Sequence, residues 1–159
     1  MSNFEYALPF ILLHEGGYVD DPSDHGGITN FGLCQRSYPD LDIANLTRDE
    51  AIAIYQRDFW QTSWDQLDKR VAAKVFDISV NCGLVWGPKI LQRALGVSDD
   101  GIVGPATIAA ANKTDTDTLL QAMCDQMEKH YEAIVAANPG DQKFLNGWES
   151  RASWIPPTA

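Results

Sequence analysis

The feature that most constrains the fold is one glycine-rich polar stretch, residues 16–32, in a chain whose other segments carry helix signals. Five glycines stand there among aspartate, proline and serine residues, a composition typical of turns and short hairpins. Elsewhere, apolar residues recur at the three- and four-residue spacing of helices that bury one face. The sequence therefore predicts an all-α, mainly helical fold with a small glycine-rich loop or β-hairpin near the N-terminus. On such a scaffold, the irregular segment is where a functional site is expected.

Three helices are expected in the first half of the chain. Asn3 is placed to cap the first of them, and Pro9 inside it should kink the helix or delay its start. Thr47 begins a capping box and predicts a second helix directly after it. A third helix is expected over about residues 69–82, ended by Gly83 in a left-handed cap. Its apolar face predicts a central position in the fold.

The second half of the chain is also predicted to be helical. Pro88 and Pro105 each fit the first turn of a short helix. A long helix is expected from Thr116 until the Asn-Pro-Gly sequence at residues 138–140. A last short helix is expected to carry Phe144, Trp148 and Trp154. The chain has no internal repeat, and its length suits a single domain over residues 1–159.

The balance of charges excludes one class of function. The chain has 12 basic and 22 acidic residues, a formal net charge of −10, which argues against binding nucleic acid. Its longest apolar run, residues 7–13, is far shorter than the roughly 20 residues of a membrane-spanning helix, so no stable membrane insertion is expected. Five basic residues between positions 69 and 93 predict a local positive face that could meet an anionic partner.

No metal or cofactor is expected. The three cysteines, Cys34, Cys82 and Cys124, match neither a disulfide framework nor a zinc pattern, and we expect them to be small buried hydrophobic residues. The chain lacks a phosphate-binding loop, a dinucleotide fingerprint and a nucleophile elbow. The aspartates of the glycine-rich stretch, together with His25, resemble a metal site but match neither the calcium-loop nor the zinc-peptidase pattern.

Glu15 is the main candidate for chemistry, because it ends the first apolar segment directly before two glycines. We expect its carboxyl group to be partly buried beside Leu12, Leu13 and Tyr18. Desolvation favours the protonated form of a carboxyl group, and a carboxyl that keeps its proton near neutral pH can act as a general acid. The alternative is a solvated side chain at a helix end.

Asp24 and Thr29 complete the candidate catalytic set. Asp24 lies in the polar loop, where a carboxyl group stays ionised, and the Thr29 hydroxyl could fix a water molecule. Two carboxyl groups in such different environments are the arrangement that glycoside hydrolysis requires. The alternative is that the loop aspartates only form turns with their own backbone.

Three motifs near the N-terminus carry a family resemblance. His14-Glu-Gly-Gly-Tyr18, Asp21-Pro-Ser-Asp24 and Gly26-Gly-Ile-Thr-Asn-Phe-Gly32 together resemble the signature of glycoside hydrolase family 108, the lysozyme-like N-acetylmuramidases of phage endolysin type. The similarity continues through residues 55–64 and 76–83. Residues 91–107 and 144–151 are similar to the C-terminal region of that family, which is described as a predicted peptidoglycan-binding region.

The resemblance covers nearly the whole chain and implies both a fold and an activity. It implies one lysozyme-like domain with a catalytic part at about residues 1–85 and a helical, peptidoglycan-binding part at about 86–159. It implies cleavage of the β-1,4 bond between N-acetylmuramic acid and N-acetylglucosamine in peptidoglycan, with Glu15 as the general acid. Asp24 and Thr29 resemble the other members of the Glu-Asp-Thr triad of phage-type lysozymes, although their interval is one residue shorter. Inverting and retaining stereochemistry both stay open.

Four further residues are candidates for binding substrate: Tyr18, Trp60, Trp64 and Asn81. Aromatic faces and amide groups inside clefts are what hold sugars. The alternative for the two tryptophans is packing in the core, and the alternative for Asn81 is a structural hydrogen bond.

Three other functions remain open at this point. The chain could be a catalytically silent peptidoglycan-binding module, a purely structural component of a phage or secretion particle, or a muramidase toxin delivered by a secretion system. Its N-terminus shows neither the basic residues nor the cleavage pattern of a signal peptide, so we expect synthesis in the cytoplasm and action on the cell wall after holin release or dedicated secretion. We expect a monomer, and the sequence does not indicate whether an immunity or inhibitor protein exists.

Overall fold

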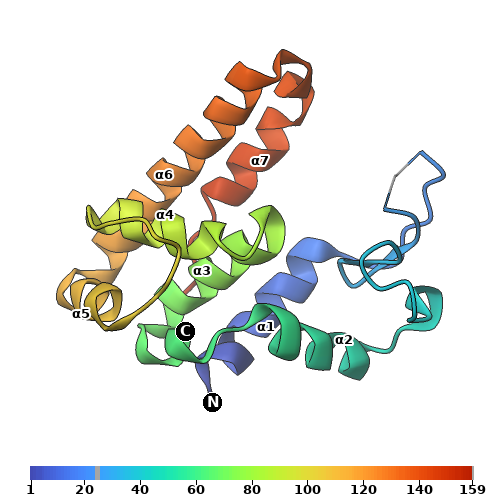
Figure 1. Ribbon diagram of the computed structural model, residues 1–159, viewed down its shortest axis with the longest axis horizontal. Helices are drawn as coiled ribbons and strands as arrows, with labels where there is room; N and C mark the ends of the chain where they lie inside the picture. The colour runs from blue at the N-terminus through green and yellow to red at the C-terminus, as the bar shows by residue number, and fades with distance from the viewer. Residues whose placement is uncertain (24–25, 159) are drawn as a thin grey trace.

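The computed structural model describes residues 1–23 and 26–158, so Asp24 and His25 lie outside the described residues (Figure 1). Seven α-helices and one two-stranded antiparallel sheet form this part of the chain. The helices are α1 (Asn3–Glu15), α2 (Arg48–Ile54), α3 (Lys69–Cys82), α4 (Trp86–Leu95), α5 (Pro105–Lys113), α6 (Thr116–Ala137) and α7 (Leu145–Ala152), and the strands are β1 (Thr29–Asn30) and β2 (Leu33–Cys34). The predicted fold class, mainly helical with a small hairpin, is confirmed.

Helix α3 forms the centre of the fold, as its apolar face predicted. It packs against α1, α4 and α6, and nine consecutive residues, 71–79, are buried. Gly87 lets α4 approach α3 closely, because a Cβ atom there would lie 2.2 Å from Val75 O and from Ser79 Oγ. Two of the buried residues of α3, Lys74 and Asp77, are charged, so each needs a partner in the interior.

The prediction that Asn3 caps α1 is wrong, because Asn3 is already the first residue of the helix. Ser2 is the cap, in a capping box with Glu5. The Asn3 amide instead donates hydrogen bonds to Trp64 O (3.0 Å) and Leu67 O (2.9 Å), which tie the start of α1 to the segment before α3. Pro9 lies on the exposed side of a helix that continues unbroken to its end, because the opposite face is held by packing in the core.

The glycine-rich stretch forms the predicted hairpin. Thr29 pairs with Cys34 and Asn30 with Leu33, which leaves Phe31 and Gly32 as a two-residue turn. Their φ angles of 51° and 79° are both positive, as a type I′ turn requires. A bridge between Val19 and Thr29 connects the loop after α1 to the same hairpin.

Helix α2 begins with the predicted capping box of Thr47 and Glu50. It continues without a break into a π-helical turn, Tyr55–Phe59, and a 3₁₀ turn, Thr62–Gln66, follows. The π turn places the Tyr55 ring in the core, where it packs against Phe59 and Phe76.

The later helix boundaries agree with the sequence, with two exceptions, at Gly83 and in the last helix. Gly96 ends α4 in the left-handed conformation, Pro105 is the first residue of α5, and α6 stops before Asn138. Gly83 ends α3 at φ 115° and ψ 153°, outside the left-handed helical region, so the left-handed cap predicted there is wrong. The last helix carries Trp148, whereas Phe144 and Trp154 flank it.

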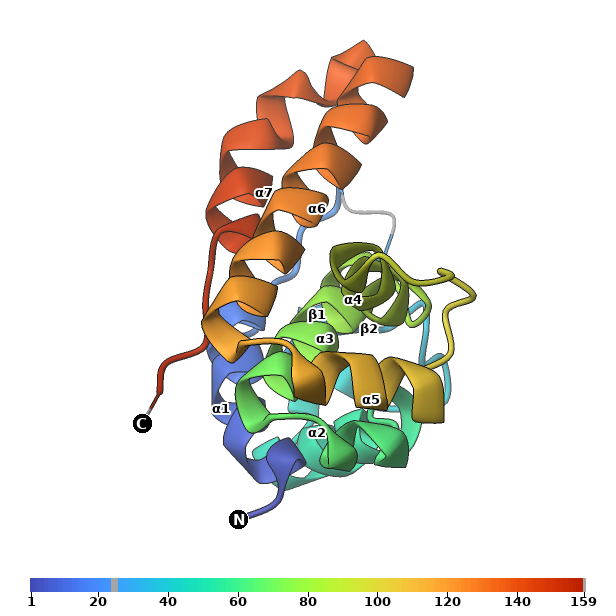
Figure 2. The same cartoon turned by 90° about the vertical axis from the view of Figure 1, so that its left-hand side faces the viewer.

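The C-terminal part is attached to α1 and α3. Helices α6 and α7 lie side by side and extend beyond the rest of the molecule, and the chain then returns along α1 (Figures 1 and 2). In this returning segment, Pro157 O accepts a hydrogen bond from Tyr6 Oη and Pro156 O accepts one from Arg70 Nε. Lys74 is fully buried, and its Nζ donates to Ala152 O (2.8 Å) and Trp154 O (2.7 Å) at the end of α7.

Two sequence expectations about side chains need correction. Of the three cysteines, only Cys124 is buried, and the other two are half-buried. The basic residues after position 69 do not form one positive face, because Lys74 is in the interior while Arg70 and Arg93 pair with Asp117 and Asp99. Among the described residues, no helix combines the length and the apolar composition needed to cross a bilayer.

Replacing Lys74 with Met should lower the free energy of unfolding by roughly 2–4 kcal/mol, because it leaves buried carbonyl groups at the end of α7 without a donor. Urea unfolding measures the change. Lys113→Met is the matched control, since Lys113 is exposed at the end of α5. Equal stability of the two variants would show that Lys74 does not hold α7 in place.

Candidate active site

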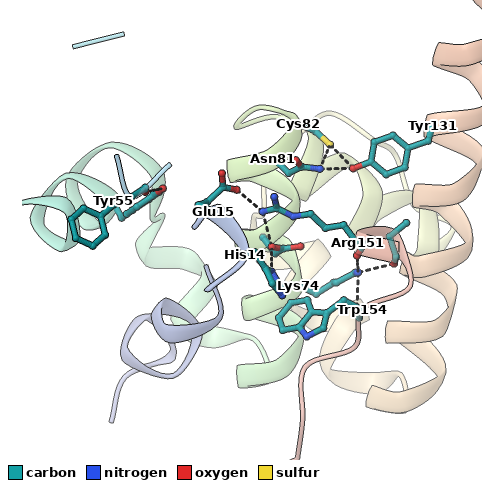
Figure 3. Close-up of polar contacts among 12 residues, drawn as sticks. His14, Glu15, Tyr55, Lys74, Asn81, Cys82, Tyr131, Arg151 and Trp154 are labelled. Atoms are coloured by element: carbon teal, nitrogen blue, oxygen red, sulfur yellow. Dashed lines mark hydrogen bonds and ion pairs between the residues drawn. The ribbon is translucent and has the colours of Figure 1, made fainter. Parts of the chain in front are cut away.

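Glu15 is the last residue of α1, and its side chain is 19% exposed. Its Oε1 accepts a hydrogen bond from Arg151 Nη2 at 2.6 Å, and the two side chains form an ion pair (Figure 3). The carboxyl group is thus partly buried, as expected, yet it still reaches solvent. A proton donor in a cleft requires both of these properties.

The surroundings of Glu15 differ from those expected. Leu13 is 77% exposed and Tyr18 is 53% exposed, so neither covers the carboxyl group. The helix ends at Glu15, and the chain leaves it through Gly16 at φ 75°. The hairpin turn and Arg151, which the sequence did not predict as neighbours, lie beside Glu15.

The hairpin turn lies directly against Glu15. A Cβ atom at Gly32 would lie 2.5 Å from Glu15 Cβ and 2.6 Å from Tyr55 Oη, so only glycine fits at this contact. Tyr55 Oη donates a hydrogen bond to Phe31 O at 2.7 Å, which fixes the turn from the other side. Burial and the charge of Glu15 raise the pKa of Tyr55, so its hydroxyl stays a donor.

Arg151 also joins Glu15 to a buried carboxylate. The same Nη2 atom lies 3.0 Å from Asp77 Oδ1, and His14 Nδ1 lies 2.9 Å from that oxygen. The His14 ring packs edge-on against Trp154, with ring centroids 4.6 Å apart. Residues from α1, α3 and α7 therefore meet in one polar network around Asp77.

Asp77 is 1% exposed and depends on these partners. Burial by itself raises the pKa of this carboxyl group, but the His14 hydrogen bond and the charge and hydrogen bond of Arg151 outweigh burial and leave the pKa below its ordinary value. Asp77 is therefore a carboxylate that anchors Arg151, and Arg151 in turn contacts Glu15.

Thr29, the next candidate catalytic residue, belongs to the hairpin. Thr29 is half-buried in β1, three residues before Gly32, and its backbone pairs with Val19 through hydrogen bonds of 2.7 and 2.8 Å. The hairpin thus places Thr29 on the structure that packs against Glu15. The prediction for Asp24 falls outside the described residues. Tyr18 precedes Val19 in the same loop and presents an exposed ring.

The candidate substrate residues divide into two groups. Trp64 is 0% exposed and packs against Trp60 and Phe76, so the prediction that it binds substrate is wrong. Trp60 is half-buried in the same aromatic cluster, and its role stays a prediction. Asn81 is exposed at the end of α3, and its amide donates to Tyr131 Oη, which leaves its sugar-binding role a prediction as well.

Sequence reasoning missed three residues of this network: His14, Asp77 and Arg151. Asp77 had a signal, because it is a charged residue inside the most deeply buried helix and so must have a partner. Arg151 had no local signal, because it lies 136 positions after Glu15 and only the packing of α7 brings them together.

No three His, Cys, Asp or Glu side chains in the described part of the chain are arranged to hold a metal ion. The described side chains of the site carry carboxyl, guanidinium, imidazole and hydroxyl groups.

Comparisons with known proteins identify the family of this chain. Residues 8–83 match the family model described as Glycosyl hydrolase 108, and residues 87–153 match the one described as Predicted Peptidoglycan domain. Brucella abortus SagA, a solved structure, is 31% identical over 94% of this chain and 89% of its own, with a TM-score of 0.78. The chain belongs to glycosyl hydrolase family 108.

The lysozyme-like fold expected from the resemblance to family 108 is thereby shown. A comparison with curated proteins gave no match. The two matched regions support peptidoglycan hydrolysis by this family 108 member. Arg151 belongs to the second region and Glu15 to the first, so residues of both regions form the site.

Replacing Gly32 with Ala should destabilise this family 108 chain by about 2–4 kcal/mol, because the new Cβ atom adds a clash with Glu15 to the strain of a positive φ angle. Gly96→Ala is the matched control, since Gly96 has φ 70° but a Cβ atom there would have no neighbour within 4 Å. Urea unfolding of both variants separates strain from clash. If both variants lost the same amount of unfolding free energy, the hairpin turn would not be in close contact with Glu15.

Asp77→Asn should reduce stability at pH 7, and the deficit should shrink as the pH falls. The folded-state pKa of Asp77 is lowered, so its stabilisation is fully present above the unfolded-state value of about 3.9 and is lost as the pH falls through the folded-state value. Urea unfolding at several pH values between 7 and 3 measures the difference between the variant and the wild type. A difference that stayed constant over this range would contradict the role given to Asp77.

Proposed function

We propose that the chain is an N-acetylmuramidase that cleaves the β-1,4 bond between N-acetylmuramic acid and N-acetylglucosamine in peptidoglycan, with Glu15 as the general acid. The observation that carries the proposal is the position of Glu15. It is a partly exposed carboxyl group at the end of α1, between the hairpin turn and the Arg151 guanidinium. Membership in family 108 supports the same reaction class.

In the proposed reaction, Glu15 first takes up a proton, and the neutral carboxyl group then donates this proton to the oxygen of the bond that breaks. Proton transfer leaves a negative charge on Glu15, and Arg151 Nη2 lies 2.6 Å from Oε1, where it stabilises that charge. Asp77 and His14 do not reach the reacting bond in this scheme. Their role is to hold Arg151 in place, so we regard them as positioning residues.

Asp24 and Thr29 are proposed to act on the other side of the sugar. A second carboxylate either activates a water molecule or stabilises the positive charge that develops on the ring. Thr29 supports this scheme, because the hairpin that carries it is fixed against Glu15 through Gly32 and Tyr55. Tyr18 is proposed to offer its exposed ring to a sugar near the same loop.

Glu15→Gln should lower the rate of peptidoglycan cleavage by at least about a hundredfold, because it removes the proton donor while keeping the shape of the side chain. Purified peptidoglycan is incubated with each protein, and the released fragments are reduced with borohydride and identified by mass spectrometry. The wild type is expected to release fragments that end in reduced N-acetylmuramic acid.

Glu132→Gln is the control, since Glu132 is exposed on α6, and circular dichroism verifies that the variants fold. Fragments that end in reduced N-acetylglucosamine would contradict the proposed bond. If the wild type bound peptidoglycan and released nothing, the chain would be a silent binding module instead.

A further inference from the structure

A hollow that Glu15 does not line lies among the C-terminal helices. Its volume is about 390 Å³, within the range of roughly 300–1,000 Å³ that is typical of small-molecule sites. It lies where the end of α3, the start of α4 and the middle of α6 meet α7. The residues that define it here are Asn81, Trp86, His130, Tyr131 and Trp148. We call it the aromatic groove.

The aromatic groove is lined by a succession of rings. The centroids of Trp86 and His130 are 4.2 Å apart, and those of His130 and Tyr131 are 5.7 Å apart. Trp148 stacks nearly parallel on Tyr131, at 5.2 Å and 20°. Trp86, His130 and Trp148 are only half-buried, so they present ring surface to solvent. A row of aromatic surfaces with amide and hydroxyl groups between them suits the apolar faces and polar edges of a sugar.

The aromatic groove adjoins the candidate active site. Asn81 and Tyr131 line it, and they also pack with Asp77 and Arg151 around a space too small to hold a water molecule. Figure 3 shows Asn81 and Tyr131 next to the Arg151 guanidinium, which itself contacts Glu15. Two residues of the aromatic groove therefore lie beside Arg151, whose guanidinium forms the ion pair with Glu15.

The charge around the aromatic groove differs from that of the whole chain. The chain carries −10, yet no acidic residue is among the described residues that line this groove. Burial and the charge of Arg93 lower the pKa of His130, which keeps its ring uncharged at neutral pH. Lys89 Nζ and Arg93 Cζ lie 5.6 and 5.4 Å from the Trp86 ring centroid. An anionic wall polymer meets less repulsion here than at an average part of this surface.

We propose that the aromatic groove binds an N-acetylated sugar of the glycan strand, beyond the sugars at the bond that Glu15 cleaves. The proposal rests on the proposed function in one respect, because it takes the strand at Glu15 to be peptidoglycan. Residues 87–153 match the model described as Predicted Peptidoglycan domain, and the proposal names the side chains of α4, α6 and α7 that would contact the sugar.

The test measures binding without turnover, in a Glu15→Gln background. Sedimentation with purified peptidoglycan gives the affinity of this protein and of the same protein carrying Trp148→Ala. Loss of the Trp148 ring should weaken binding about tenfold. Leu41→Ala in the same background is the matched control, since Leu41 is an exposed apolar side chain at a different hollow, of about 440 Å³, and should bind as the parent does.

A direct measurement keeps the test valid if Trp148→Ala fails to fold. The tetramer of N-acetylglucosamine is titrated into the Glu15→Gln protein, and the ring resonances of His130, assigned with His130→Gln, are followed by NMR. We expect them to shift in a saturable way. Unshifted His130 resonances would overturn the proposal, as would a folded Trp148→Ala variant that binds peptidoglycan as tightly as Leu41→Ala does.

The two proposals can fail separately. A wild type that releases no fragments contradicts the proposed function, whereas the binding measurements above need no cleavage. If the aromatic groove instead takes an apolar protein partner, neither peptidoglycan binding nor the His130 resonances will respond as expected, and the sugar assignment falls.

Discussion

The structure depends on the burial of one carboxylate, Asp77, at the centre of the fold. A buried charge is costly unless it is paired and hydrogen-bonded, and Asp77 meets this requirement with Arg151 and His14. The pairing brings α1, α3 and α7 to one point. Because Arg151 uses the same Nη2 atom for Asp77 and for Glu15, the interaction that satisfies the interior also fixes the surroundings of the candidate acid.

This network joins the two regions that the family models match separately. The hydrolase region ends at residue 83 and the peptidoglycan region begins at residue 87, but Arg151 of the second contacts Glu15 of the first. Lys74 adds a second connection, since its buried ammonium group holds the carbonyl groups at the end of α7. The C-terminal helices are therefore part of the site and not only an attachment to it.

Local signals in the sequence predicted most helices and the candidate acid. These signals act through neighbouring residues, so their effects can be predicted from short segments. They are the capping box at Thr47, Pro105 at the start of α5, Pro88 in the first turn of α4 and the glycines of the hairpin. The cap of α1 was misplaced because Ser2 and Asn3 are both good caps, and only the long-range hydrogen bonds of Asn3 distinguish them. The sequence could not show whether Trp64 is buried or at the surface, because its burial depends on contacts with Phe76 and Trp60, which lie on other elements.

The sequence by itself determined the fold class, the position of Glu15 at a helix end and the hairpin that follows it. These features follow from periodicity, from the absence of a side chain at glycine and from capping, all of which act over a few residues. Only the tertiary structure decided what surrounds Glu15: Gly32 and Tyr55 on one side and Arg151 on the other. Contacts between residues far apart in the chain depend on how α3 packs with α1 and α7. That packing satisfies the buried charges of Lys74 and Asp77 together, and no single segment encodes it.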